Sequence, residues 1–271
     1  MLVAENTHNQ KTAVIDYGLV SIVMPNYNSE QYIEASIKSV LAQTYQNWEL
    51  LVVDDCSTDN SLELAKSFND DRIKIFQNDT NSGAAVSRNY AIKMAKGKWI
   101  AFLDSDDIWL PEKLSDQLRF MVENNYYFSY TVYSQIDEFS NPLNIEVFGP
   151  KKIGKHKMFQ YNYVGCLTVI YNAEKTGFIQ VEPSLQRRND YAIWLKVCRH
   201  CDCYMLNKNL ALYRIRTNSL SHSGMKGKIR SQYQLFRCGE NMCVIRAVWY
   251  TMVNMVFGVF KKIFYIKSLK D

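Results

Sequence analysis

Short apolar runs alternate with segments of helical periodicity through the first half of this sequence of 271 residues. Four runs are expected to be buried strands, and the apolar residues after each of them recur at helical spacing. The expected strands are Val20–Met24, Leu50–Val53, Ile73–Phe76 and Trp99–Leu103. The expected helices are residues 33–41, Ser61–Phe68, Ala84–Ala95 and Pro111–Asn124. This alternation predicts a Rossmann-like α/β fold, in which helices cover both faces of a mostly parallel sheet.

The second half of the sequence is less regular. We expect strands at Tyr126–Tyr133 and Leu167–Tyr171, a helix at Asp190–Cys201 and a loop at Gly149–Gly154. Residues 1–18 have neither the basic start nor the apolar core of a signal peptide, and we expect a flexible N-terminal tail there. The seven cysteines form no C-x-x-C pair, which is typical of free thiols in the reducing cytoplasm.

Positive charge is concentrated at the C-terminal end of the chain. From Gly224 onward, nine Lys and Arg residues accompany only Glu240 and Asp271, a net charge of +7. The whole chain carries +5, so the residues before Gly224 are slightly acidic. A basic C-terminal segment after a slightly acidic domain indicates an anionic partner at the C-terminus. It argues against nucleic-acid binding by the domain itself.

Three of the expected strands end in polar clusters, at Pro25–Asn28, Asp54–Asp59 and Asp104–Asp107. In an open parallel sheet, ligands bind beyond the carboxyl ends of the strands. The polar residues after Asp55 alone would also fit a helix N-cap. Three clusters at one edge of the sheet favour a shared binding site.

The run Asp104-Ser105-Asp106-Asp107 places three carboxylates together, which is unfavourable unless a cation lies among them. Oxygen ligands suit Mn²⁺ or Mg²⁺, which typically bind one or two carboxylates plus substrate phosphates. In an extended stretch, Asp104 and Asp106 lie on the same side, so these two are the expected metal ligands. An EF-hand is excluded because Trp109 stands where that loop needs Gly. The alternative, that the carboxylates only cap the next helix, stays open.

No G-x-G-x-x-G or Walker sequence follows any expected strand, which disfavours dinucleotide and P-loop chemistry. Gly83 stands where a backbone could approach a ligand at a helix N-terminus. Arg88, about one turn further along, could contact an anionic group or could be a solvated charge on the helix surface.

Three stretches together resemble the family 2 glycosyltransferases, which are inverting enzymes of the GT-A fold that use nucleotide sugars. The stretches are VSIVMPNYNSEQYIEASIKSVLAQTYQNWELLVVDDCSTDNS, NSGAAVSRNYAIKMAKGKWIAFLDSDDIWLPEKL and RNDYAIWLKV. The resemblance is strong from about Val20 to Leu114 and weaker to about Ser221. It implies a GT-A domain at residues 19–223, with a nucleotide-sugar half at about 19–110 and an acceptor half at about 111–223. Residues 224–271 would form a basic amphipathic helical segment.

The resemblance also implies roles for single residues. Asp190 matches the catalytic base, although Asn189 stands before it where relatives often have Glu. Asp104 and Asp106 match the D-x-D metal motif, and Asp106 is the surer ligand. The segment YRIRTNSLS, Tyr213 to Ser221, resembles a loop that can close over the diphosphate. With the polar clusters above, the expected substrate-binding residues are Pro25, Tyr27, Asn28, Asp54, Asp55, Gly83, Arg88, Asp104, Ser105, Arg214 and Arg216.

These roles imply a metal-dependent inverting hexosyltransferase. Asp190 would take a proton from an acceptor hydroxyl, which attacks the anomeric carbon of a UDP-sugar, with UDP-glucose or UDP-galactose expected. Bacterial relatives in O-antigen and capsule synthesis imply an acceptor sugar on a polyprenyl diphosphate. Two alternatives are a sugar-1-phosphate nucleotidyltransferase, which needs a Gly-rich basic loop that PNYN does not provide, and a non-catalytic binding or scaffold protein with the same fold.

The C-terminal segment contains a 14-residue apolar stretch, Ala247–Phe260, with Arg246 before it and Lys261 and Lys262 after it. Roughly 20 residues are needed to span a bilayer, so this stretch should not cross one. An aromatic-rich apolar face flanked by lysines suits a helix in the membrane interface, at the cytoplasmic face of a bacterial inner membrane. A helix packed on the protein itself, or a dimer contact, remains an alternative.

Overall fold

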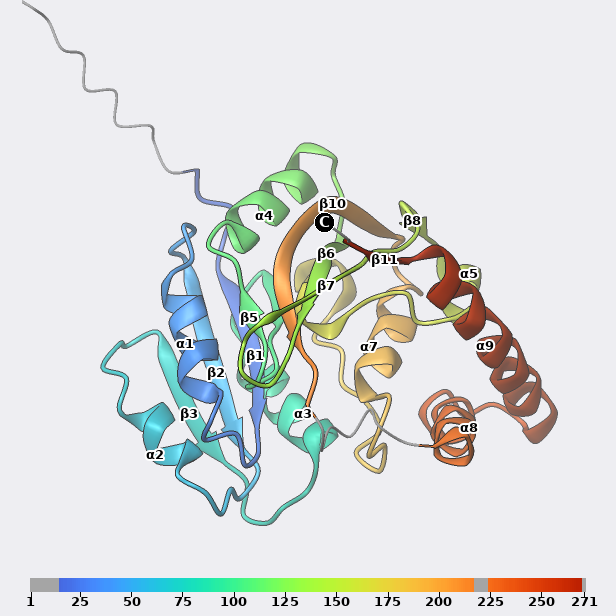
Figure 1. The fold of residues 1–271 in the computed structure, drawn as a ribbon, viewed down its shortest axis with the longest axis horizontal. Coiled ribbons are helices and arrows are strands. Elements are labelled where there is room, and N and C mark those ends of the chain that lie inside the picture. The colour runs from blue at the N-terminus through green and yellow to red at the C-terminus, as the bar shows by residue number, and fades with distance from the viewer. Residues whose placement is uncertain (1–14, 217–223, 270–271) are drawn as a thin grey trace, which may run out of the picture.

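The computed structural model describes residues 15–216 and 224–269, so Thr217–Ser221, part of the expected diphosphate loop, lies outside the described residues. The strands are β1 (Val20–Asn26), β2 (Trp48–Asp54), β3 (Ile73–Gln77), β4 (Trp99–Phe102), β5 (Ile108–Trp109), β6 (Phe128–Ile136), β7 (Pro142–Val147), β8 (Lys152–Ile153), β9 (Ile170–Asn172), β10 (Cys203–Arg214) and β11 (Ile266–Ser268). The α-helices are α1 (Ile33–Leu41), α2 (Ser61–Lys66), α3 (Ala84–Met94), α4 (Lys113–Glu123), α5 (Lys155–Gln160), α6 (Ala173–Thr176), α7 (Asn189–Val197), α8 (Met225–Gln234) and α9 (Val244–Phe264). Figure 1 shows their arrangement.

The described strands form one sheet, eight of them in the order β11-β7-β6-β9-β4-β1-β2-β3, and β10 joins it by pairing with β5, β6 and β8. β1 pairs in parallel with both β2 and β4, and β2 pairs in parallel with β3. β9 is antiparallel to β4 and β6, and β10 runs parallel to β6. The predicted α/β fold with parallel strands at the centre of the sheet is therefore confirmed, and every antiparallel pair includes a strand from the second half of the chain.

Alternate residues of the central strands face two hydrophobic cores, one on each face of the sheet. Ile22 and Met24 of β1 pack with α1 and α4, whereas Val23 packs with α3 and α7. Strands that are buried on both faces carry continuous apolar runs, which explains why these strands were detectable in the sequence. The expected helices on both faces are confirmed.

Three expected elements differ from the structure. Pro111 lies in a turn, and α4 begins at Lys113. The expected strand Leu167–Tyr171 is instead a 3₁₀ turn (Cys166–Thr168) followed by β9. The indole of Trp109 donates to the carbonyl of Leu167 at 2.7 Å, so a distant side chain stabilises this turn. The expected loop Gly149–Gly154 contains β8, which pairs with β10.

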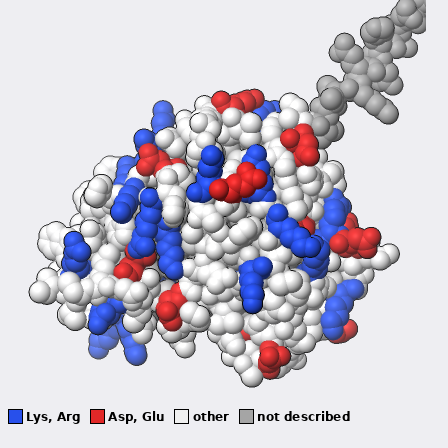
Figure 2. Space-filling model, turned by 180° about the vertical axis from the view of Figure 1, so that it is seen from behind, with Lys and Arg blue, Asp and Glu red and all other residues white. Residues whose placement is uncertain are grey.

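The C-terminal segment is joined to the rest of the molecule. β11 pairs with β7, and α9 packs beside α5 (Figure 1). A π-helical turn, Leu235–Gly239, continues α8 and places Phe236 against the ring of Tyr250 in α9. Lys and Arg side chains gather on the side of the molecule that carries α5, α8 and α9, at the left of Figure 2. Within the described ranges, no helix is both long enough and apolar enough to cross a membrane.

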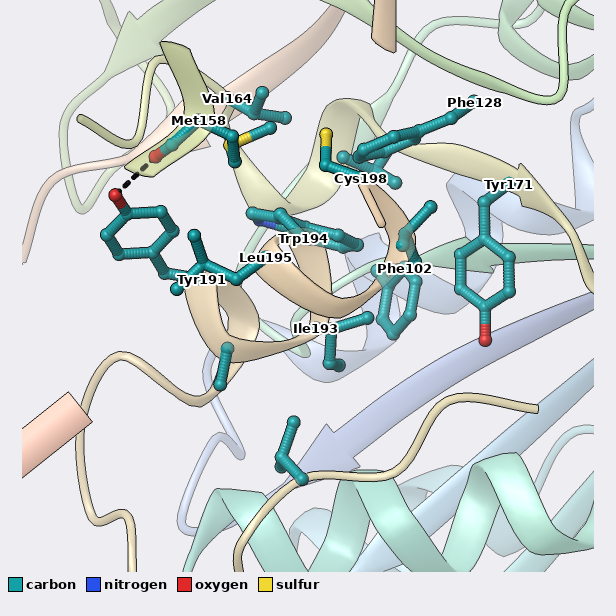
Figure 3. Packing of buried hydrophobic residues seen from close by; sticks show 14 of the residues in the cluster. Phe102, Phe128, Met158, Val164, Tyr171, Tyr191, Ile193, Trp194, Leu195 and Cys198 are labelled. Atoms are coloured by element: carbon teal, nitrogen blue, oxygen red, sulfur yellow. Dashed lines mark hydrogen bonds between the residues drawn. The ribbon is translucent and has the colours of Figure 1, made fainter. Parts of the chain in front are cut away.

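Helix α7 is held in the core by Trp194. Its indole packs edge-on against Phe102 of β4, with ring centroids 5.0 Å apart, and lies 5.8 Å from the ring of Phe128 (Figure 3). The hydroxyl of Tyr191 donates to the carbonyl of Met158 at 2.5 Å, which ties the same helix to α5. The first turn of α7 is thereby fixed near the end of β4.

Candidate functional site

Two arginines lie among the carboxylates that follow β4. Arg88, buried on α3, donates to the carboxylate of Asp104, and Nε of Arg216 lies 2.9 Å from the carboxylate of Asp106. A carboxylate cluster is tolerable when cations are placed inside it, and the fold supplies one from α3 and one from the end of β10. The sequence left open whether Arg88 is a solvated surface charge; the structure shows it buried and paired.

The crowding of these groups changes their acidity. Burial raises the pKa of Asp106; Arg216 opposes that shift, and the neighbouring Asp104 adds to it. Burial also raises the pKa of Asp107 well above its usual range, and Asp106 and Asp104 add to that effect. For Arg88, burial alone would lower the pKa, but the charge of Asp104 raises it above its ordinary value. An added cation would therefore be stabilised in this cluster.

Asp104 and Asp106 fit a divalent cation. Each has one carboxylate oxygen paired with an arginine. The described residues contain no group of three or more His, Cys, Asp or Glu side chains that could hold a metal by themselves. Two carboxylates that leave the remaining positions to water and phosphate match the way Mg²⁺ and Mn²⁺ bind with nucleotides.

Asp107 and Ser105 have different surroundings from their two neighbours. One oxygen of Asp107 accepts from the backbone N–H of Arg214 at 2.9 Å, and its other oxygen is buried with no hydrogen-bond partner among the described residues. Its carbonyl accepts from Ser36 of α1 at 2.7 Å. Asp107 thus connects the carboxylate cluster to β10 and α1. Ser105 is buried between Asp104 and Asp106.

The ends of β1 and β2 are joined by Asp54. Its carboxylate accepts from the amide of Asn26 at 2.7 Å and from the backbone N–H and hydroxyl of Ser57 at 3.0 and 2.5 Å. Asp54 is completely buried, so this carboxylate shapes the loop after β2.

Asp55 positions the loop before α3. Its carboxylate accepts from the backbone N–H groups of Ser82 and Gly83 at 2.8 and 2.7 Å and from the amide of Asn78 at 2.7 Å. Gly83 has φ 87° and ψ 162°, a conformation that is essentially restricted to glycine. A Cβ at this position would have no atom within 4 Å. Glycine is therefore required by the backbone conformation and not by crowding from neighbouring atoms.

Tyr27 and Asn28 extend beyond β1 at the edge of the sheet. Tyr27 is exposed, whereas Asn28 accepts from the backbone N–H of Thr58 at 2.8 Å, and Pro25 is half-buried in β1. A pocket of about 500 Å³ opens beside them. It is lined by Asn28, Glu30, Gln31, Tyr32, Asp59, Glu138 and Arg216. The volume lies within the range of small-molecule sites.

The two arginines of the expected diphosphate loop occupy different places. Arg214 is buried, and its side chain donates to the carbonyl of Asp106 at 2.8 Å and to the hydroxyl of Ser140 at 2.9 Å. Arg216 is about 29% exposed and lines the pocket. Both guanidinium groups lie over the ring of Tyr32, at 4.9 and 5.3 Å. Arg216 is therefore the better placed of the two to meet a phosphate.

Asp190 lies in the first turn of α7, and Arg88 fixes that turn. The guanidinium of Arg88 donates to the side chain of Asn189 as well as to Asp104, so it joins α7 to the end of β4. Asp190 contributes to raising the pKa of Arg88, which places these charges within electrostatic range. The Asp190 carboxylate forms no hydrogen bond or ion pair with the described residues. It is available to accept a proton.

Several residues at this site were not predicted from the sequence. Asn189 was noted only as a departure from Glu, yet it is a partner of Arg88. Tyr32 and Glu138 line the pocket, and neither belongs to a recognisable motif. The only signal for Tyr32 was its position directly before an expected helix. Nothing local marks Glu138, which lies in the turn between β6 and β7.

Comparisons with known proteins identify the family of the chain. Residues 21–176 match the model of the family described as Glycosyl transferase family 2. The chain is 38% identical to the Escherichia coli UDP-Glc:alpha-D-GlcNAc-diphosphoundecaprenol beta-1,3-glucosyltransferase WfgD over 257 residues, 94% of this chain and 99% of that protein.

Two solved structures show the same fold. S. aureus TarS, in complex with UDP-GlcNAc, is 22% identical with a TM-score of 0.67 and covers 86% of this chain and 70% of its own. The mannosyltransferase PcManGT from Pyrobaculum calidifontis, in complex with GDP-Man and Mn²⁺, is 15% identical with a TM-score of 0.62, over 90% and 72% of the two chains. At these identities the likeness establishes the GT-A fold.

Proposed function

The chain belongs to glycosyl transferase family 2, and from this membership we propose that it is an inverting transferase that moves a hexose from a UDP-sugar to a lipid-linked acceptor sugar. One observation carries the proposal. At the end of β4, Arg88 connects Asp104 of the carboxylate pair to the turn that presents Asp190, and Arg216, paired with Asp106, lines a pocket of about 500 Å³. This arrangement can hold the donor's diphosphate with its anomeric carbon facing Asp190, the base that activates the acceptor.

Asp190 accepts the proton of the acceptor hydroxyl as that oxygen forms a bond to the anomeric carbon. The bond from the anomeric carbon to the diphosphate oxygen breaks on the opposite face, and the configuration inverts. Asp104 and Asp106 would hold Mn²⁺ or Mg²⁺, which supplies positive charge to the departing diphosphate. Arg216, partly exposed at the pocket, adds a second positive group toward the same phosphates.

The donor and acceptor in this proposal follow the named relative. WfgD is named for UDP-glucose and GlcNAc-diphosphoundecaprenol, and this chain matches nearly its whole length. We take UDP-glucose as the first donor to test, with UDP-galactose second. The acceptor class is a sugar on a polyprenyl diphosphate, as in the assembly of O-antigen or capsule repeat units.

We also propose that α9 docks the enzyme on an anionic membrane surface, at the cytoplasmic face of the inner membrane. The outward face of α9 is apolar along its length, with Ile245 81%, Trp249 63% and Ile263 64% exposed. Its other face, with Ala247, Thr251 and Asn254, is buried against the protein. The basic excess of the C-terminal segment supports an anionic lipid surface as the occupant (Figure 2).

A radiolabelled transfer assay tests the function. The protein is incubated with Mn²⁺, UDP-[¹⁴C]glucose and GlcNAc-diphosphoundecaprenol in detergent, and radioactivity is counted in the organic phase. We expect label in the lipid and a β-linked product by NMR. An organic phase without label, for UDP-glucose, UDP-galactose and UDP-N-acetylhexosamines alike, would overturn the proposal.

A further inference from the structure

Two cations that the mechanism above does not use lie near the first turn of α7: Lys261 is within electrostatic range of Asp190, and Arg188 is two residues before it. Lys261 comes from α9, and Arg188 immediately precedes α7. We propose that Lys261 and Arg188 bind the diphosphate of the lipid-linked acceptor and so position its sugar at Asp190. The inference rests on the proposed function and assigns a second phosphate site, separate from the one at Asp104 and Asp106.

Helix α9 is fixed where Lys261 can reach this position. The amide of Asn254 donates to the carbonyl of Phe159 at 3.1 Å and to the hydroxyl of Tyr191 at 3.2 Å. Further along the same face, α9 passes so close to Tyr161 that a Cβ on Gly258 would lie 3.0 Å from that ring. Lys261 follows on this inward face, so its position is set by packing against α5 and α7.

Lys261 has no carboxylate partner at ion-pair distance within the described ranges. Its Nζ donates to the carbonyl of Asn162 at 3.2 Å and lies 5.7 Å from the ring centre of Tyr161. Burial lowers the pKa of Lys261 to about 8; Asp190 opposes that shift, and Arg188 adds to it. A partly buried ammonium with neutral contacts and a second cation nearby is stabilised by an anion.

The positive charge of Arg188 also has no carboxylate partner at ion-pair distance among the described residues. Its side chain forms no hydrogen bond or ion pair with any residue that the structure describes. Its backbone is in the left-handed region, with φ 62°, which is unusual for a residue other than Gly or Asn and is often found at functional sites. It directly precedes the N-terminus of α7, where the helix dipole also favours negative charge.

The cluster of Lys261 and Arg188 is distinct from the donor's phosphate site. Lys261 donates to the carbonyl of Asn162 and lies by the ring of Tyr161, whereas Asp104 and Asp106 are paired with Arg88 and Arg216. Helix α9 also lies at the opposite end of the molecule from β3 and α2 in Figure 1. An acceptor held here could extend its isoprenoid chain along the apolar outer face of α9, toward the membrane.

The test uses a soluble acceptor, GlcNAc diphosphate carrying an undecyl chain, so that membrane docking plays no part. Lys261→Met keeps the aliphatic stem without the charge, and Arg188→Gln keeps a polar side chain. Lys262→Met, at the next and exposed position of α9, is the matched control. KM for the acceptor is measured at saturating UDP-glucose, and Kd for the acceptor by isothermal titration without donor.

We expect Lys261→Met and Arg188→Gln each to raise both KM and Kd for the acceptor at least tenfold. We expect KM for UDP-glucose to change less than twofold, and Lys262→Met to match the wild type in all three. Lys261→Arg should restore most of the affinity. An unchanged acceptor Kd in both variants, or a change confined to KM for UDP-glucose, would overturn the inference. If the wild type transfers no sugar, the proposed function fails, and the titration alone still decides whether the diphosphate binds here.

Discussion

The Nε of Arg216 lies 2.9 Å from the carboxylate of Asp106, and the two residues come from opposite halves of the chain. Asp106 lies between β4 and β5, whereas Arg216 follows the last long strand, β10. The ion pair therefore joins the expected metal ligand to the segment that would cover the diphosphate. It also explains how the carboxylates after β4 are tolerated before a ligand arrives.

The first prediction concerns Asp106. Asp106→Asn removes the negative charge that would hold the metal and diphosphate, so Mn²⁺-dependent binding of UDP should weaken at least tenfold, about 1.4 kcal/mol. Isothermal titration of UDP with and without Mn²⁺ measures this effect. Asp202→Asn, in an exposed ion pair with Lys152, is the control and should bind as the wild type does. An Asp106→Asn protein with full Mn²⁺ dependence would contradict the metal assignment.

The second prediction concerns Gly83, whose φ of 87° a side chain tolerates poorly. Gly83→Ala should lower the free energy of unfolding by about 1–3 kcal/mol and raise KM for the UDP-sugar, because the Gly83 N–H orients Asp55. Urea unfolding and initial rates measure the two effects. Gly224→Ala is the control, since Gly224 has φ −57° and open space around it. Equal stability of both variants would refute the strain argument.

The third prediction concerns Lys113, which is completely buried, with no hydrogen-bond partner for Nζ among the described residues. Burial lowers its pKa well below the ordinary value. Lys113→Met should therefore raise the free energy of unfolding by about 1–3 kcal/mol at pH 7. The cation–π interaction of Lys113 with the Trp109 ring, 4.0 Å away, reduces this gain because the variant loses it.

The same lysine gives a pH dependence. Between its lowered folded pKa and its unfolded value near 10.4, the unfolded chain binds more protons, so this residue makes the wild type more stable as pH rises. The advantage of Lys113→Met should then shrink as pH rises above 7, as measured by urea unfolding across the range. Lys93→Met, at an exposed position of α3, should show no such trend. An advantage that grows with pH would contradict the account.

The fourth prediction concerns the outer face of α9. Trp249→Asp with Ile263→Asp introduces charge into a face that we propose to lie among lipid headgroups, so sedimentation with vesicles containing phosphatidylglycerol should fall severalfold. Val122→Asp changes an exposed apolar residue on α4 instead and should sediment as the wild type does. Equal sedimentation of all three proteins would exclude α9 as the membrane contact.

The fold was predictable where local pattern and burial agree. The strands β1, β2 and β4 lie between two cores, so their apolar runs are continuous and easy to detect. The segment Leu167–Tyr171 is also apolar, but the hydrogen bond from Trp109 and the packing around it favour a 3₁₀ turn over a longer strand. No local signal in the sequence contains that interaction.

The parts of the site that belong to a single motif were predictable from the sequence, and the contacts between different elements were not. Asp104 and Asp106 belong to one short motif, so their proximity followed from the sequence. The role of Arg88 depends on Asp104 and Asn189, which lie on different elements, and only the fold brings the three together. Lys261 comes within electrostatic range of Arg188 because α9 packs on α5 and α7, a contact between segments that share no motif.

The most direct test of the central claim, that Asp190 is the base of a sugar transfer, is the single-turnover rate of Asp190→Asn with UDP-[¹⁴C]glucose and the GlcNAc-diphosphate acceptor. The account predicts a rate about 10²–10⁴-fold below that of the wild type, with affinity for UDP within about twofold. A variant that transfers glucose at nearly the rate of the wild type would contradict it.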